Sequence, residues 1–122
     1  MKQPLDPFPY PQDARSRPID ATFPDGLYVY VQDDSGIVWG LPDGPHMHPK
    51  VLGNGKHAMY AGDLTVEAGK IKDVTNLSGT FGFDDELGLL AVADQLGRQG
   101  IEVEPGAIRF FPADGSRPQI LG

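Results

Sequence analysis

The stretch GLYVYVQDDSGIVWGL, at residues 26–41, restricts the possible folds of this chain more than any other segment does. Leucine and valine alternate with tyrosine over residues 27–31, and this two-residue period is that of a β-strand. The DDSG sequence that follows is rich in turn-forming residues, so residues 37–39 are expected to begin a return strand. Because both faces of the first strand carry bulky side chains, we expect a central strand, or one with a face covered by the N-terminal segment.

A second hairpin is predicted for AGDLTVEAGKIKDV, at residues 61–74, where apolar and polar residues again alternate. Gly69 is placed to form its turn. Ile71 and Val74 are three residues apart, so they cannot both face the core in a regular strand. We therefore expect a β-bulge near Asp73, or a strand that leaves the sheet there.

One amphipathic helix is predicted for DDELGLLAVADQLGRQG, at residues 84–100. Asp84 is placed to cap its first turn, and Gly100 is the expected residue just beyond its last turn. Its apolar residues recur at the three- and four-residue spacing of a helix face that packs on a core: Leu89, Val92, Ala93 and Leu96. A final strand is expected in AIRFFP, at residues 107–112.

These elements predict an α+β fold: a small antiparallel sheet of two hairpins plus a C-terminal strand, with one amphipathic helix packed on a face. A Gly- and Pro-rich loop is expected to join the hairpins over residues 40–57. Residues 1–24 hold six of the 12 prolines and are expected to form an extended N-terminal arm, either packed on the domain or free. Residues 25–122 are expected to form a single domain.

The charge and composition of the chain argue against several classes of function. A net charge of −7 argues against a nucleic-acid ligand, whose phosphates require a basic surface, and against docking on an anionic membrane. The absence of cysteine excludes disulfides, thiolate catalysis and cysteine-ligated zinc. No glycine-rich phosphate-binding motif is present, so no cofactor is expected. The first residues lack the apolar run of a secretory signal, so a cytoplasmic protein is expected.

All three histidines of the chain, His46, His48 and His57, fall within the predicted loop, in the sequence GPHMHPKVLGNGKH. Both imidazoles of an H-x-H pair can ligate one metal, and His57 and Asp63 could complete a ligand set. A metal-binding protein that uses the three histidines is therefore one alternative. The prolines on either side of the pair favour a loop, where surface or packing roles for the histidines are expected.

Ser78, in NLSGTF, is the serine placed best for nucleophilic catalysis, since it follows a predicted strand and precedes the helix. No G-x-S-x-G elbow surrounds it, which argues against a hydrolase triad. Asp84, Asp85 and Glu86 form a cluster of carboxylates. Their place at the predicted helix start favours a role in capping over acid–base chemistry.

The run HPKVLG, followed by AGDLTVEAGKIKDVTNLSGTF, resembles a module with the consensus HSSFLAGG-x-V-x-AAGE-x-V-x-x-G-x-I-x-x-I-x-N-x-SGHY-x-P. This module occurs in plant IQ-motif calmodulin-binding proteins and in bacterial toxin-like C-terminal domains. The resemblance covers residues 27–101 and places His48 on the motif histidine. The other matched residues are Ala61, Gly62, Asp63, Gly69, Ile71, Asn76, Ser78 and Gly79. Thr80 and Phe81 replace the His-Tyr of the module, and Pro49 and Lys50 replace its Ser-Ser.

The resemblance implies a small bacterial binding or interaction module, an accessory or immunity-like protein of a toxin system, with a protein partner. The acidic composition and the lost polar motif groups favour this interpretation. The alternative is a catalytic toxin-type domain, a nucleotide-dependent transferase, whose cleft would be lined by His48, Asp63, Ser78 and Thr80. No IQ helix is present, so calmodulin binding is not expected. The sequence leaves the oligomeric state open.

Overall fold

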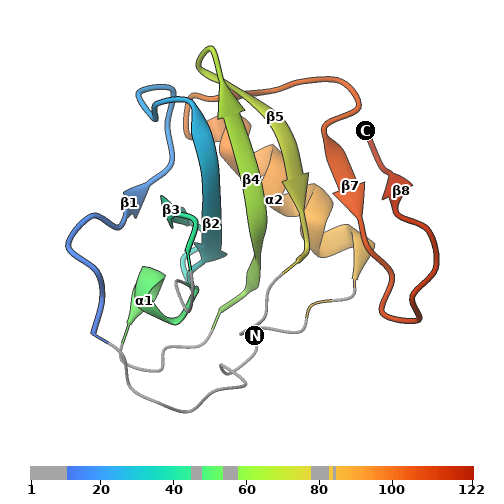
Figure 1. The fold of residues 1–122 in the computed structure, drawn as a ribbon, viewed down its shortest axis with the longest axis horizontal. Coiled ribbons are helices and arrows are strands. Elements are labelled where there is room, and N and C mark those ends of the chain that lie inside the picture. The colour runs from blue at the N-terminus through green and yellow to red at the C-terminus, as the bar shows by residue number, and fades with distance from the viewer. Residues whose placement is uncertain (1–10, 45–47, 54–57, 78–82, 84) are drawn as a thin grey trace.

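The computed structural model describes residues 11–44, 48–53, 58–77, 83 and 85–122. Within them the chain forms one sheet of eight strands and two α-helices (Figure 1). The elements are β1 (Arg17–Pro18), β2 (Gly26–Gln32), β3 (Val38–Pro42), α1 (His48–Leu52), β4 (Tyr60–Glu67), β5 (Lys70–Thr75), α2 (Glu86–Arg98), β6 (Glu102–Val103), β7 (Ile108–Phe110) and β8 (Gln119–Ile120). A sheet with a packed helix is confirmed, but the sheet is larger than predicted.

The strands follow the order β1-β3-β2-β4-β5-β7-β8 across the sheet, with β6 also paired to β5. Both predicted hairpins are present, as β2–β3 and β4–β5, and β2 is central because it pairs with β3 and β4. The prediction of an antiparallel sheet is wrong at one place, because β6 and β7 pair with β5 in parallel. Helix α2 connects β5 to these strands, and such a helical crossover returns the chain in the direction in which β5 runs.

The predicted bulge is present in the second hairpin. The pairing of β4 with β5 shifts between Thr65 and Val66, where Lys72 is an extra residue on β5. This extra residue restores the phase of the strand, so Ile71 and Val74 are both fully buried despite their three-residue spacing.

Helix α2 forms where the sequence predicts a helix, and its buried face is the predicted apolar stripe. Its N-cap is Asp85, whose carboxylate accepts a hydrogen bond from the N–H of Gly88. The prediction of Asp84 as the cap is therefore wrong by one residue, and Asp84 itself lies outside the described residues.

The C-terminal end of α2 closes as a Schellman motif. Gly100 has a φ of 92°, and its N–H donates to the carbonyl oxygen of Gly97. The next residue, Ile101, donates to the carbonyl oxygen of Leu96 and buries its side chain in the core. The prediction that Gly100 follows the last turn is therefore confirmed.

A second helix, α1, lies within the stretch that was expected to be a loop. The expectation is wrong here because Pro49 is the second residue of the helix, and the first turn of a helix requires no N–H from its residues. Helix α1 packs against β2 and β3 on one face of the sheet, while α2 lies behind the sheet in the same view (Figure 1). Val51 of α1 is fully buried.

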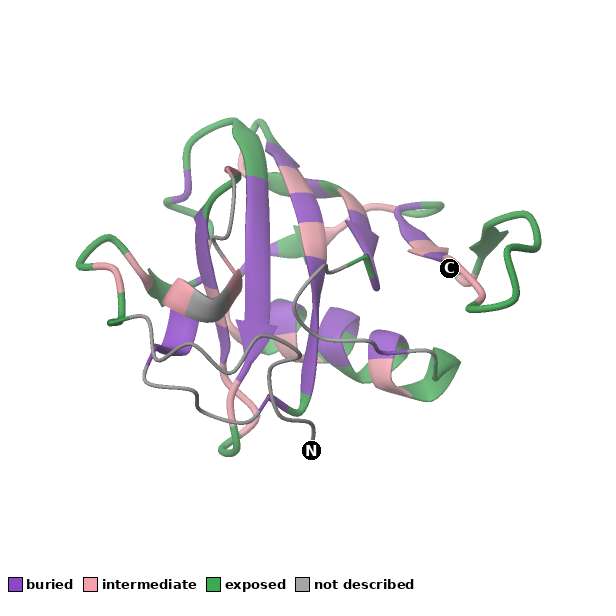
Figure 2. Ribbon diagram, turned by 60° about the horizontal axis from the view of Figure 1, so that its bottom comes forward, coloured by how far each residue is buried: buried purple, intermediate pink, exposed green. Residues whose placement is uncertain are grey.

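The core occupies both faces of the central strands, and successive β2 residues are therefore buried on either side (Figure 2). The N-terminal arm also contributes to this core, because Ile19 and Phe23 are buried in it. In the part of the chain that the structure describes, no helix is both long and apolar enough to cross a bilayer.

Candidate functional site

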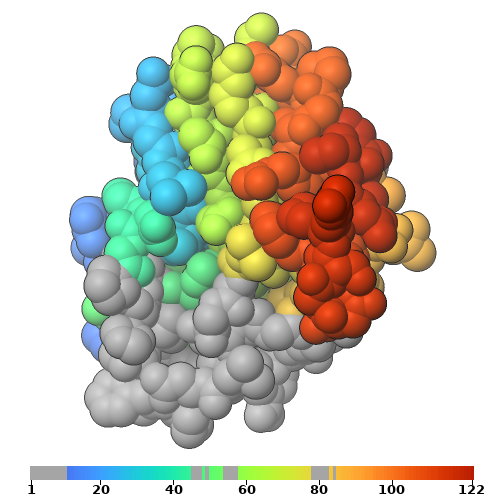
Figure 3. All heavy atoms as spheres, turned by 45° about the vertical axis from the view of Figure 1, so that its right-hand side comes forward, coloured from blue at the N-terminus to red at the C-terminus, as the bar shows by residue number. Residues whose placement is uncertain are grey.

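Polar side chains from four elements gather on the sheet face that α1 partly covers. His48 is the first residue of α1, Asp63 lies on β4, and Thr75 lies on β5. Arg109 lies on β7, where it pairs with Thr75 across the parallel ladder. In Figure 3 the atoms of β4 and β5, in yellow-green and yellow, lie between β2 and the β7–β8 end of the chain.

His48 is tied to β4 through its ring. Its Nε2 atom lies 2.7 Å from the carbonyl oxygen of Gly62. Because a carbonyl oxygen only accepts, Nε2 carries the proton in this contact. Burial lowers the pKa of His48 from its ordinary value of 6.5, against the opposing effects of the Gly62 hydrogen bond and the Asp63 carboxylate. His48 is therefore a mainly neutral imidazole at neutral pH.

Asp63 is the half-buried carboxylate next to His48. Its Oδ1 accepts a hydrogen bond of 2.7 Å from the hydroxyl of Thr75, which itself accepts from the N–H of Leu77. Burial raises the pKa of Asp63, and the Thr75 hydrogen bond opposes this rise. The negative charges of Asp73 and Asp43 raise the pKa of Asp63 further.

A second carboxylate on this face is paired with a cation. Nε and Nη2 of Arg109 donate to the two oxygens of Asp73 at 2.5 Å and 2.7 Å, which is a bidentate pair. The guanidinium also lies 5.3 Å from the centre of the Phe111 ring. The hydrogen bonds and the charge of Asp73 raise the pKa of Arg109, so the guanidinium stays charged.

Two residues that match the resembled module have packing roles in this chain. A Cβ atom on Gly62 would lie 1.9 Å from the carbonyl oxygen of Thr75, so only glycine fits this position. The same carbonyl accepts a hydrogen bond from the buried hydroxyl of Tyr30. The buried amide of Asn76 donates to the carbonyl oxygens of residues 83 and 111 and accepts from the N–H of Phe111.

The structure brings together two of the four predicted cleft residues, His48 and Asp63. Ser78 and Thr80 lie outside the described residues, as do His46 and His57. Among the residues that are described, no three His, Cys, Asp or Glu side chains group as a metal site requires.

Sequence reasoning missed Thr75, Asp73 and Arg109 as members of this site. A weak signal for Arg109 exists, because it is the one charged residue in the apolar strand AIRFFP. Asp73 and Thr75 flank a buried valine, and this spacing places them on one face of a strand. The contact of β5 with β7 depends on the parallel pairing, which the sequence analysis did not predict.

Comparisons with models of protein families, with curated proteins and with solved structures gave no match to this chain in any of the three. The resemblance to the module of plant IQ-motif and bacterial toxin-like proteins therefore stays a prediction.

Proposed function

We propose that this chain is a small binding module that recognises a protein partner through the polar sheet face around His48, Asp63 and the Asp73–Arg109 pair. On this proposal it serves as an accessory or immunity-like protein in a bacterial toxin system.

One observation carries the proposal: the polar groups of this face are bonded to one another and to the chain itself. His48 bonds a backbone carbonyl, Asp63 bonds the Thr75 hydroxyl, and Asp73 bonds Arg109. Groups held in this way form a rigid surface that loses little entropy on binding, which favours recognition.

The charges on this sheet face indicate which side chains a partner would present to it. The face carries Asp63 and Asp73 against Arg109, with His48 mainly neutral, and the whole chain has a net charge of −7. A partner with lysine or arginine side chains at its contact surface would complement this face and would be attracted over longer distances.

A second candidate function, a nucleotide-dependent transferase, is favoured by one separate observation. Burial moves the pKa values of His48 and Asp63 toward each other, lowering the first and raising the second. Neighbouring titratable groups with such shifts are more frequent in catalytic sites than elsewhere.

The two functions are separated by one pair of variants. Asp63→Asn removes the charge while leaving an oxygen that can accept from Thr75, and Asp34→Asn removes an exposed carboxylate from the β2–β3 turn as a matched control. Tagged protein is used for affinity capture from the native host, and each captured protein is then purified and titrated by calorimetry.

We expect a basic partner whose affinity falls about tenfold or more with Asp63→Asn and falls with added salt, while Asp34→Asn binds normally. An affinity unchanged by Asp63→Asn would contradict the proposed surface. If no partner is recovered while NAD⁺ or ATP raises the melting temperature of the wild type, the transferase function is supported instead.

A further inference from the structure

We infer that residues 11–16 form a strap that holds α1 on the sheet, so that release of the strap opens the His48 side of the site while the core stays folded. This inference concerns regulation of the proposed binding face, so its functional part rests on the proposed function.

The strap bonds the last carbonyl groups of α1. The N–H of Asp13 donates to the carbonyl oxygen of Lys50 at 2.9 Å. The carbonyl oxygen of Val51 accepts from Nε2 of Gln12 at 3.0 Å and from the hydroxyl of Ser16 at 2.6 Å. Since a helix leaves its last four carbonyls without an internal partner, the strap satisfies groups that α1 cannot satisfy by itself.

The strap also packs closely on the residue that follows α1. Gly53 has a φ of 75°, and a Cβ atom there would lie 2.3 Å from the backbone nitrogen of Gln12. The backbones of the strap and of this turn are therefore in direct contact. A side chain at position 53 would separate them.

Helix α1 depends on such external contacts because it is only five residues long. Isolated helices of this length do not form in water, so packing and end contacts must hold the element. His48 bonds Gly62 at the N-terminal end of the helix, Val51 and Leu52 pack in the core, and the strap bonds the C-terminal end. Loss of the strap removes the polar contacts at the C-terminal end and leaves α1 held by two buried side chains and the His48 bond.

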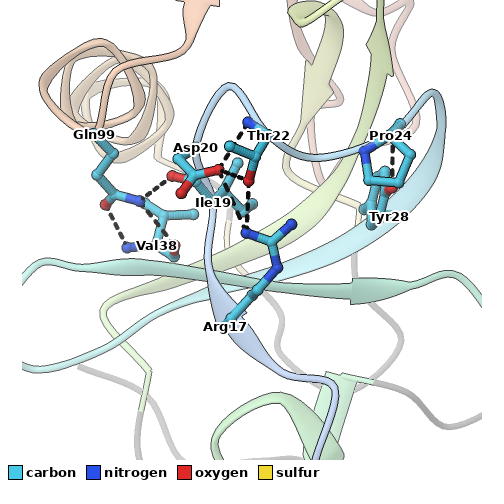
Figure 4. A network of polar contacts seen from close by, with 8 residues as sticks. All are labelled: Arg17, Ile19, Asp20, Thr22, Pro24, Tyr28, Val38 and Gln99. Atoms are coloured by element: carbon cyan, nitrogen blue, oxygen red, sulfur yellow. Dashed lines mark hydrogen bonds and ion pairs between the residues drawn. The ribbon is translucent and has the colours of Figure 1, made fainter.

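The arm beyond the strap is anchored to the rest of the fold by polar contacts, several of which are drawn in Figure 4, and by buried side chains. The amide of Gln99 donates to the carbonyl oxygens of Ile19 and Val38 at 2.8 Å and 3.0 Å. The side chain of Ile19 is fully buried, and Arg17 lies over the ring of buried Phe23.

The strap itself buries none of its residues fully. Its Asp13–Arg15 ion pair is formed within the strap and does not tie it to the core. Polar contacts at a half-exposed surface open at lower free energy than a buried core does. The difference between strap and anchor therefore favours local release of the strap, which loosens the end of α1 that it holds, without unfolding of the sheet.

The test uses the full chain with the double substitution Gln12→Ala and Ser16→Ala, which removes both side-chain hydrogen bonds to Val51. Ser116→Ala is the matched control, because it removes a serine hydroxyl bond to Asp114 in the turn between β7 and β8. Amide hydrogen exchange is measured over residues 50–53 and over β2, β4 and α2. Diethyl pyrocarbonate, which acylates neutral histidine, is the probe for exposure of His48.

We expect the double variant to raise exchange over residues 50–53 roughly tenfold and to speed acylation of His48, with β2, β4 and α2 unchanged. Unchanged exchange at residues 50–53, or an equal rise in every element, overturns the strap. If α1 opens but a partner captured as described above binds the double variant and the wild type equally, the regulatory part is overturned and the proposed function stands. If no partner exists, the proposed function fails, and the exchange and acylation results still decide the strap.

Discussion

Gly62 and Thr75 are neighbours only because residue 62 has no side chain: a Cβ atom there would lie 1.9 Å from the Thr75 carbonyl oxygen. This approach lets the hydroxyl of Tyr30 reach the same carbonyl. It also places the Thr75 hydroxyl on Asp63, so the geometry of the candidate site depends on one glycine.

The substitution Gly62→Ala is expected to lower the free energy of unfolding by about 3 kcal/mol or more, because the added methyl group meets backbone that cannot move without breaking the β4–β5 pairing. Gly97→Ala is the control. Gly97 lies in α2 with no atom within 4 Å of an added Cβ, so alanine there is expected to raise stability by about 0.5–1 kcal/mol. Urea denaturation measures the free energy of unfolding of both variants. Similar effects of the two substitutions would contradict the close approach of Gly62 to Thr75.

His48 is expected to titrate below 6.5 in the folded protein, because burial disfavours the imidazolium. The unfolded chain then binds the proton more readily than the folded chain, so this histidine reduces stability as the pH falls below about 6.5. The pKa of His48 is measured from the chemical shifts of its imidazole protons as a function of pH. His48→Gln should flatten the decrease in stability over this pH range, and a titration at or above 6.5 would refute the expectation.

Replacing Asp63 and replacing Asp73 by asparagine are expected to have different effects on the stability of the protein. The charge of Asp63 is disfavoured by burial, so Asp63→Asn should leave stability at pH 7 unchanged or raise it. Asp73→Asn removes the charge that pairs with the half-exposed Arg109, and should lower stability by about 1 kcal/mol. Both variants are measured by urea denaturation at pH 7.

The difference in stability between the wild type and Asp63→Asn is expected to depend on pH. The raised pKa of Asp63 means that the folded chain holds this proton more tightly than the unfolded chain. The deficit of the wild type relative to Asp63→Asn should therefore shrink as the pH falls through the raised pKa toward 3.8. A deficit that grows on acidification would contradict the direction of the shift.

Gln99→Ala is expected to lower the free energy of unfolding by about 2 kcal/mol, because it removes the partner of the Val38 N–H and of the Ile19 carbonyl oxygen. Gln95→Ala removes a single bond between side chains and should cost about 0.5 kcal/mol. Thermal denaturation followed by circular dichroism compares the stabilities of the two variants. Equal losses of stability would contradict the role of Gln99 in satisfying these backbone groups.

Part of the candidate site could be predicted from the sequence. The motif resemblance singled out His48 and Asp63, which lie next to one another, whereas Asp73 and Arg109 were not predicted. The bond between these two residues joins positions 36 apart through a parallel pairing. No pattern of neighbouring residues encodes such a contact.

The sequence by itself determined the two hairpins, the bulge near Asp73 and the C-terminal end of α2. These features follow from interactions over a few residues: alternation along a strand, the turn at Gly69, and Gly100 beyond the last helical turn.

Only the tertiary structure decided the parallel strands, helix α1 and the packing of the arm. The helix α1 is too short to form from its own residues and exists through its packing on the core and its contacts with the strap and with Gly62. The bond of Gln99 to Ile19 spans 80 residues. Such contacts form when the folded core brings distant backbone groups together and removes them from water, so their stability belongs to the assembled fold.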